Sequence, residues 1–172
     1  MKLKPGQVNI MELAQPDLMT VADKEFHEVD IEVALDSGAV DHVINKCDIP
    51  GYRVVPSAGS MRGLHFVAAN GDVIDNLGQA TVNLAPHDSK TQVQSTSQVA
   101  AVSRPLYSAT KIADQGCTIA MDKHSAVVSK GGKPVAKFLR KRGLYLCKMT
   151  LKAPRIGDAK PAVDFPRPAT GA

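Results

Sequence analysis

The residues best suited to chemistry are Asp36, Ser37 and Gly38, which stand together directly after an apolar run. A carboxylate held at a turn can act as a general acid or base. Glycine permits both a tight turn and the close approach of another backbone. Taken alone, the tripeptide is better explained by an Asx turn between two strands, in which Asp36 and Ser37 bond their own backbone.

Two apolar segments flank this turn and must position it. Phe26 to Leu35 contains alternating apolar residues and predicts a strand, and Val40 to Ile44 predicts a second strand. The carboxylate of Asp36 is therefore expected at the mouth of a turn between strands and not on a mobile surface.

A β-hairpin is predicted from Leu64 to Ile74, because Asn70-Gly71 lies between two apolar runs. Asn-Gly readily supplies the positive φ values of a type I′ turn. Gly63 and Gly78 flank the hairpin and predict compliant ends.

The remaining patterns describe one mostly β domain, over residues 26–152, with one short helix. Ser108 fits an N-cap and Gly116 a stop, which bounds that helix. Strands are predicted at 80–84, 117–121, 126–129, 134–139 and 144–151, a short apolar run lies at 99–102, and loops are predicted at 47–63 and 86–96. Residues 1–25 predict a lead-in or edge strand, and the proline-rich residues 153–172 a disordered tail.

Composition sets limits on the class of protein. The chain has 172 residues, a net charge of +4 and 44% hydrophobic residues, which is ordinary for a single globular domain. Its three cysteines are widely spaced and include no C-x-x-C, which argues against a disulfide framework and favours a reducing compartment. Because no apolar run is long enough to span a bilayer, we expect a cytoplasmic protein that does not enter a membrane.

Histidine and serine residues offer weaker candidate sites. The five histidines show no paired-ligand spacing, so we expect no metal and no cofactor, and we interpret each as a surface or satisfied histidine. Ser37, Asp41 and His42 could be drawn as a catalytic triad, but no G-x-S-x-G elbow accompanies them.

A basic cluster from Lys137 to Arg142, with Phe138 and Tyr145 nearby, raises the question of RNA binding. A solvated edge strand protected by charge explains the same residues. We favour that explanation, so nucleic acid is a possible but not a favoured partner.

The order of these elements resembles the retropepsin-like aspartic proteases, and most closely those of copia-type retrotransposons. The similarity covers residues 26–152. It rests on Asp36-Ser37-Gly38-Ala39, Asp41-His42, the hairpin at Asn70-Gly71, Leu106-Tyr107-Ser108 before a helix, Gln115 to Ile119, and Gly143 to Cys147.

The resemblance implies a retropepsin-like half-barrel that is closed by homodimerisation. Only one D-[ST]-G is present, whereas these enzymes need two carboxylates that share a proton, so each chain would supply one Asp36. Asp36, Ser37 and Gly38 would be catalytic, and the hairpin would form a flap over the substrate. The substrate-binding and flap residues implied are Ala39, Val67, Ala68, Ala69, Asn70, Gly71 and Asp72. Val40 and Ser108 exclude the Asp–Arg contact that joins these two regions in retroviral enzymes.

We therefore expect an aspartic endopeptidase that acts as a homodimer on a polypeptide substrate, in the processing of a retroelement polyprotein. A different hypothesis keeps the fold without the chemistry: a catalytically inactive dimerisation or nucleic-acid-binding module. The two hypotheses differ in whether the Asp36 carboxylates meet.

Overall fold

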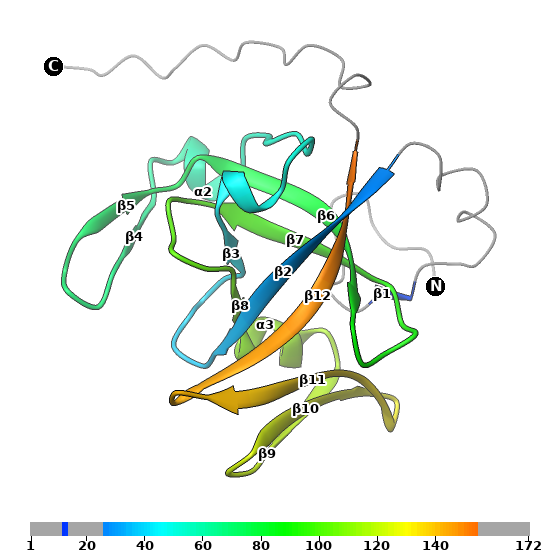
Figure 1. The fold of residues 1–172 in the computed structure, drawn as a ribbon. Coiled ribbons are helices and arrows are strands. Elements are labelled where there is room, and N and C mark those ends of the chain that lie inside the picture. The colour runs from blue at the N-terminus through cyan, green and yellow to red at the C-terminus, as the bar shows by residue number, and fades with distance from the viewer. Residues whose placement is uncertain (1–11, 14–25, 155–172) are drawn as a thin grey trace, which may run out of the picture.

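The computed structural model describes residues 12–13 and 26–154, and the fold is mostly β (Figure 1). In chain order the strands are β1 (Glu12–Leu13), β2 (Phe26–Asp36), β3 (Val43–Ile44), β4 (His65–Val67), β5 (Val73–Asp75), β6 (Gly78–Pro86), β7 (Val93–Val99), β8 (Leu106–Ser108), β9 (Cys117–Met121), β10 (Ser125–Lys130), β11 (Lys133–Lys141) and β12 (Leu144–Pro154). The helices are short: η2 (Lys46–Asp48), α2 (Ala58–Met61) and α3 (Ala109–Asp114). In the described residues, no helix has the length and apolarity needed to cross a membrane.

Six strands close into a barrel within the chain, in the order β7, β3, β8, β2, β12 and β6. The ring closes because β6 pairs with both β12 and β7. On the other side of β12, strands β11, β10 and β9 extend the sheet away from the barrel. Closure by homodimerisation stays a prediction.

Strand β2 is fixed from both sides, and this fixes the position of Asp36. It pairs antiparallel with β12 along its length and parallel with β8, which sets Asp36 opposite Ser108. Its side chains Ile31, Val33 and Leu35 are buried in the core. Burial of such side chains stabilises a fold by roughly 1.5–3 kcal/mol each. Asp36 therefore stands at the end of one of the best-anchored strands.

Two strand predictions were wrong, and both errors have a physical cause. Val40 was expected in a strand, but β3 begins only at Val43, and Val40 is 79% exposed in the preceding turn. The segment 86–96 was expected to be a loop, but β7 begins at Val93 and buries alternate residues. Two of these are Ser95 and Ser97, whose small hydroxyl side chains face the core and conceal the apolar alternation.

Smaller differences concern the loops and the chain ends. The short helix α2 lies within the predicted loop 47–63, in addition to the predicted helix α3. Strand β12 continues through Pro154, two residues into the expected tail. Cys47 is exposed, whereas Cys117 and Cys147 are buried. The rest of the expected lead-in and tail lies outside the described residues.

Gly78, the first residue of β6, is expected to be difficult to replace. Its φ is +127°, and a Cβ atom there would lie 2.3 Å from the carbonyl oxygen of Val55. We expect Gly78→Ala to lower the free energy of unfolding by roughly 3 kcal/mol, because the backbone must move to make room for the added methyl group. Gly63→Ala is the control, because φ is +69° and a Cβ atom there would have nothing within 4 Å. Its free energy of unfolding should fall by about 1 kcal/mol. Urea unfolding of both variants measures the difference, and equal losses would contradict it.

Candidate functional site

The Asp36 carboxylate occupies the turn that follows β2. Its Oδ1 accepts a hydrogen bond of 2.7 Å from the backbone N–H of Gly38, so the Asx turn is present. Within the described residues, no hydrogen bond or ion pair uses the other carboxylate oxygen. Ser37 and Gly38 are exposed. The turn thus holds the carboxylate through one oxygen and leaves the other available.

The far end of this turn is anchored to the start of α3. The backbone N–H of Ser108 donates to Nδ1 of the buried His42 at 3.0 Å. Asp41 forms an ion pair of 3.3 Å with Lys111. Burial, and after it the charge of Lys111, lowers the pKa of His42 to about 3. His42 is therefore neutral, and accepting at Nδ1 places its proton on Nε2.

These contacts join the turn after β2 to the start of α3. Sequence patterns alone assigned no such anchoring role to His42, Asp41 or Lys111. His42 was interpreted as a satisfied or surface histidine, and it is a satisfied one. The Asp41-His42 pair was visible in the motif, but its partners lie far along the chain in α3 and at its N-cap, and no local pattern reveals them.

A second segment, residues 100–105 between β7 and β8, is also held firmly. The Asn45 side chain donates to the carbonyl of Val102 at 2.9 Å, and Ala34 N–H donates to the carbonyl of Pro105 at 2.9 Å. Ala100 N–H donates to the carbonyl of the β3 residue Ile44 at 3.1 Å. This segment forms a wall beside the Asp36 turn.

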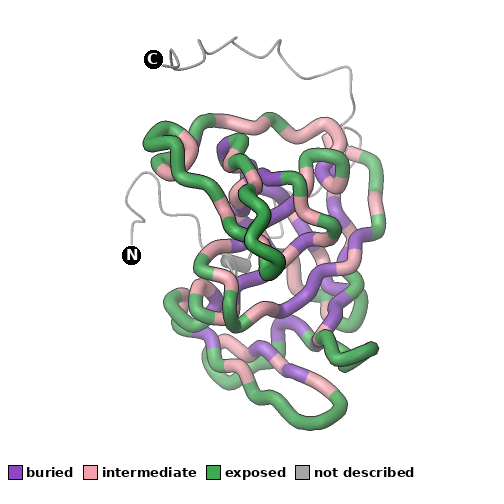
Figure 2. The backbone as a smooth tube through the Cα atoms, turned by 90° about the vertical axis from the view of Figure 1, so that its left-hand side faces the viewer, coloured by how far each residue is buried: buried purple, intermediate pink, exposed green. Residues whose placement is uncertain are grey.

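The third component is the hairpin of β4 and β5, which forms a separate two-stranded sheet. It projects from the barrel on the same side as the turn after β2 (Figure 1). Figure 2 looks onto this side and shows the hairpin largely exposed.

Together the three segments line a cleft of about 540 Å³. The lining residues are Asp36, Gly38, Ala39, Val40, Asp41, Val43, His65, Phe66, Val67, Ala68, Ala69, Ile74, Ala101, Val102, Ser103, Arg104 and Leu106. Most of them are apolar, and Asp36 is one of few charged groups. The resemblance implied that Asp36 and the hairpin belong to one site, and in the structure residues of both line one cleft. No sequence pattern singled out Arg104.

Comparison with family models, curated proteins and solved structures finds no match to this chain. Any function proposed for the chain therefore depends on its residues and their geometry.

The hairpin residues named from the sequence divide into two groups. Val67, Ala68 and Ala69 line the cleft, as does Ala39 on the Asp36 turn, whereas Asn70, Gly71 and Asp72 form the tip and do not. The turn is not type I′, because Gly71 is its only residue with a positive φ, +89°. The Gly71 N–H donates to the carbonyl of Ala68 at 2.9 Å. At the tip, the Asn70 side chain donates to Asp72 Oδ2 at 2.6 Å.

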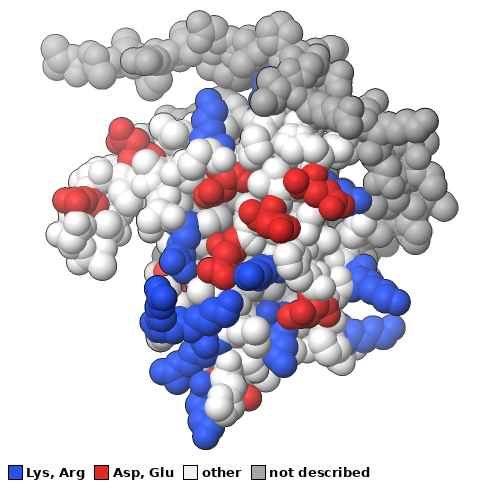
Figure 3. All heavy atoms as spheres, in the orientation of Figure 1, with Lys and Arg blue, Asp and Glu red and all other residues white. Residues whose placement is uncertain are grey.

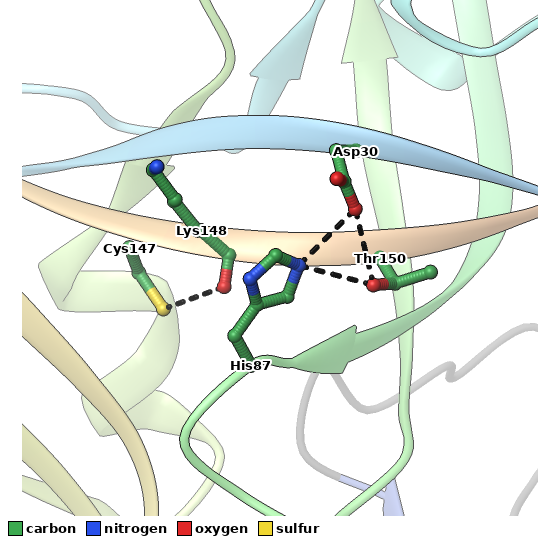
Figure 4. A network of polar contacts seen from close by, with 5 residues as sticks. All are labelled: Asp30, His87, Cys147, Lys148 and Thr150. Carbon is green, nitrogen blue, oxygen red and sulfur yellow. Dashed lines mark hydrogen bonds and ion pairs between the residues drawn. The ribbon is translucent and has the colours of Figure 1, made fainter.

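A second polar cluster lies on the outer face of β2 and β12 (Figure 4). Nε2 of His87 lies 3.1 Å from Asp30 Oδ1 and 3.1 Å from the Thr150 hydroxyl. A histidine that relays a proton needs its acid and its nucleophile on different ring nitrogens. Here both contact the same nitrogen, and Asp30 is 77% exposed. The cluster is a surface network and not a catalytic triad.

Neither a serine-type triad at the Asp36 turn nor a metal centre finds support in the described residues. None of their hydrogen bonds joins Ser37 to His42, whose Nδ1 is taken by Ser108. In residues 12–13 and 26–154, no group of three His, Cys, Asp or Glu could hold a metal ion. Ser95 and Ser97 on β7 and Tyr107 on β8 are buried in the core, and burial raises the pKa of Tyr107.

Proposed function

We propose that the chain is a retropepsin-like aspartic endopeptidase of the copia type, active as a homodimer. The observation that carries the proposal is the cleft that holds the Asp36 turn on one side and the projecting hairpin on another. This pairing of a strand-anchored carboxylate with a ribbon that can exclude water suits hydrolysis of a polypeptide laid between them.

The need for a second chain follows from the charges in the cleft. Peptide hydrolysis by carboxylates needs two of them: one accepts a proton from the attacking water, and the other donates a proton to the substrate carbonyl oxygen. Of the two carboxylates lining the cleft, Asp41 is already paired with Lys111. Asp36 therefore requires a carboxylate from another copy, and a two-fold axis would supply Asp36 itself.

Exposed apolar side chains around the cleft support a covering partner or substrate. Val40 on the Asp36 turn is 79% exposed, and Val67 and Val73 on the hairpin are 66% and 62% exposed. Apolar groups concentrated at one place on a surface are typical of an interaction site.

The direct test is digestion of a diverse peptide library by the full chain at several pH values and protein concentrations. We expect cleavage at internal peptide bonds, with a rate per chain that rises with concentration as dimers form. If no peptide is cleaved under conditions in which the chain is dimeric, the proposal is wrong.

The hairpin gives a separate prediction. Gly71→Val adds a side chain at φ +89° where nothing lies within 4 Å, so the free energy of unfolding should fall by only about 1–2 kcal/mol. We expect kcat to fall by roughly tenfold or more, because a distorted tip closes poorly. Gly132→Val is the matched control, with φ +77° and open space in the β10–β11 turn. Equal effects of both variants on kcat would remove the flap assignment.

A second candidate function is binding of nucleic acid by the outer strands, and the distribution of charge favours it. Residues 117–154 carry nine basic residues, Lys and Arg, and one acidic residue. Residues 26–116 carry six basic and ten acidic residues. The basic side chains gather over the lower strands in Figure 3. Phe138 is buried and the Tyr145 hydroxyl donates to the Asp122 carbonyl at 2.7 Å, so binding would depend on phosphates more than on stacking.

Titration of labelled single-stranded RNA at increasing salt tests this candidate. Phosphate-driven binding should weaken steeply with salt, and Lys137→Glu should weaken it further. Absence of binding at low salt would leave the solvated edge strand as the explanation.

A further inference from the structure

One cationic side chain lines the cleft without a use in the proposed mechanism. Arg104 shares the cleft with Asp36 and is only partly exposed. None of its hydrogen-bonding groups has a partner in the described residues, and no carboxylate there lies within ion-pairing distance. An arginine that is half-withdrawn from solvent and unpaired can bind a carboxylate through two parallel hydrogen bonds.

The backbone on either side of Arg104 is held by hydrogen bonds, which makes it suited to selecting a ligand. The flanking residues Val102 and Pro105 are both held by hydrogen bonds through their carbonyl groups, to Asn45 and Ala34. Pro105 itself is buried. A guanidinium on such a support loses less freedom on binding than one on a mobile loop.

The charge of the cleft indicates what this arginine would bind. Asp41 is neutralised by Lys111, so the unpaired ionisable groups of the lining are Asp36, His65 and Arg104. In the proposed dimer the two Asp36 carboxylates share one proton and carry a single negative charge. The two copies of Arg104 then leave the substrate channel with an excess of positive charge.

We propose that Arg104 selects polypeptide substrates that carry an Asp or Glu side chain beside the scissile bond. The proposal rests on the proposed function, because it assigns a substrate class to the same cleft. Arg104 acts here as a specificity residue, and it takes no part in proton transfer.

Matched peptides test the proposal by exchange of charge. Three peptides that differ only in Glu, Gln or Lys at each position near the cleaved bond are compared as substrates of the full chain, Arg104→Gln and Arg104→Glu. We expect Arg104→Gln to lower kcat/KM for the Glu peptide by roughly tenfold to a hundredfold. For the Gln peptide kcat/KM should change little, and Arg104→Glu should come to prefer the Lys peptide. Arg53→Gln, an exposed arginine outside the cleft lining, is the control and should leave all three unchanged.

The outcomes separate this proposal from the proposed function. Cleavage by the unsubstituted chain with no preference for Glu, or an equal loss for all three peptides in Arg104→Gln, would overturn the role of Arg104 and leave the peptidase intact. An equal loss would mean that Arg104 pairs with a carboxylate of the protein dimer. No cleavage of any peptide by the dimeric chain would overturn both.

Discussion

Asp36→Asn is expected to abolish peptide hydrolysis, with a loss of roughly a thousandfold or more in kcat, and to leave the fold unchanged. The amide oxygen can still accept the 2.7 Å hydrogen bond from Gly38 N–H that holds the turn. An amide cannot exchange a proton with water as a carboxylate does. Thermal melting should therefore stay close to that of the unsubstituted chain while turnover disappears.

Asp41→Asn is the matched control, because it makes the same chemical change further along the same loop. It breaks the ion pair with Lys111, which has partly exposed partners and is worth about 1 kcal/mol or less. Activity should stay within a few-fold of the unsubstituted chain. If Asp36→Asn retains comparable activity, Asp36 is not the catalytic carboxylate.

Acid is expected to destabilise the protein strongly through His42. Its pKa is about 3 in the folded chain against an ordinary value of 6.5, so the unfolded state binds the proton more readily. The stabilisation is fully present above pH 6.5 and is lost as the pH falls toward 3. This one residue then accounts for a loss on the order of 5 kcal/mol in the free energy of unfolding.

Urea unfolding at about pH 7, 5 and 4 measures this effect, with His42→Asn and His124→Asn beside the unsubstituted chain. His42→Asn offers an acceptor to the Ser108 N–H but does not titrate, so its stability should depend less on pH. His124 is exposed, and its replacement should leave the slope of the unfolding free energy against pH unchanged. Identical slopes for all three proteins would show that His42 does not control acid stability.

The same residue connects stability with the proposed activity. His42 anchors the turn that carries Asp36, so its protonation should disorder the site before the whole chain unfolds. The acid limit of the pH profile should therefore reflect His42 as well as the two ionisations of the carboxylate pair.

Elements with strong local patterns were predicted well from the sequence. The alternation of Phe26 to Leu35 predicted β2 to within one residue, and Ser108 and Gly116 bounded α3. Strand β7 was missed because its inward-facing Ser95 and Ser97 look polar in the sequence, although both are fully buried. The type I′ turn was wrong because a longer loop lets Gly71 alone take a positive φ.

The site was predictable only in part, for a similar reason. Asp36 and the hairpin carry recognisable local motifs, and the structure sets both around one cleft. His42 and Arg104 depend on contacts between distant segments: Ser108 lies 66 positions from His42. Closure of the barrel likewise depends on β6, which pairs with both β7 and β12, two strands that lie far from each other in the chain.

The central claim is that one catalytic site is made from the Asp36 residues of two chains. Mixing unsubstituted chains with increasing fractions of Asp36→Asn chains, under conditions of subunit exchange, tests it most directly. If each site needs two carboxylates, activity should fall as the square of the fraction of unsubstituted chains, because mixed dimers are inactive. A fall in simple proportion to that fraction would mean that each chain works alone, and would contradict the shared site.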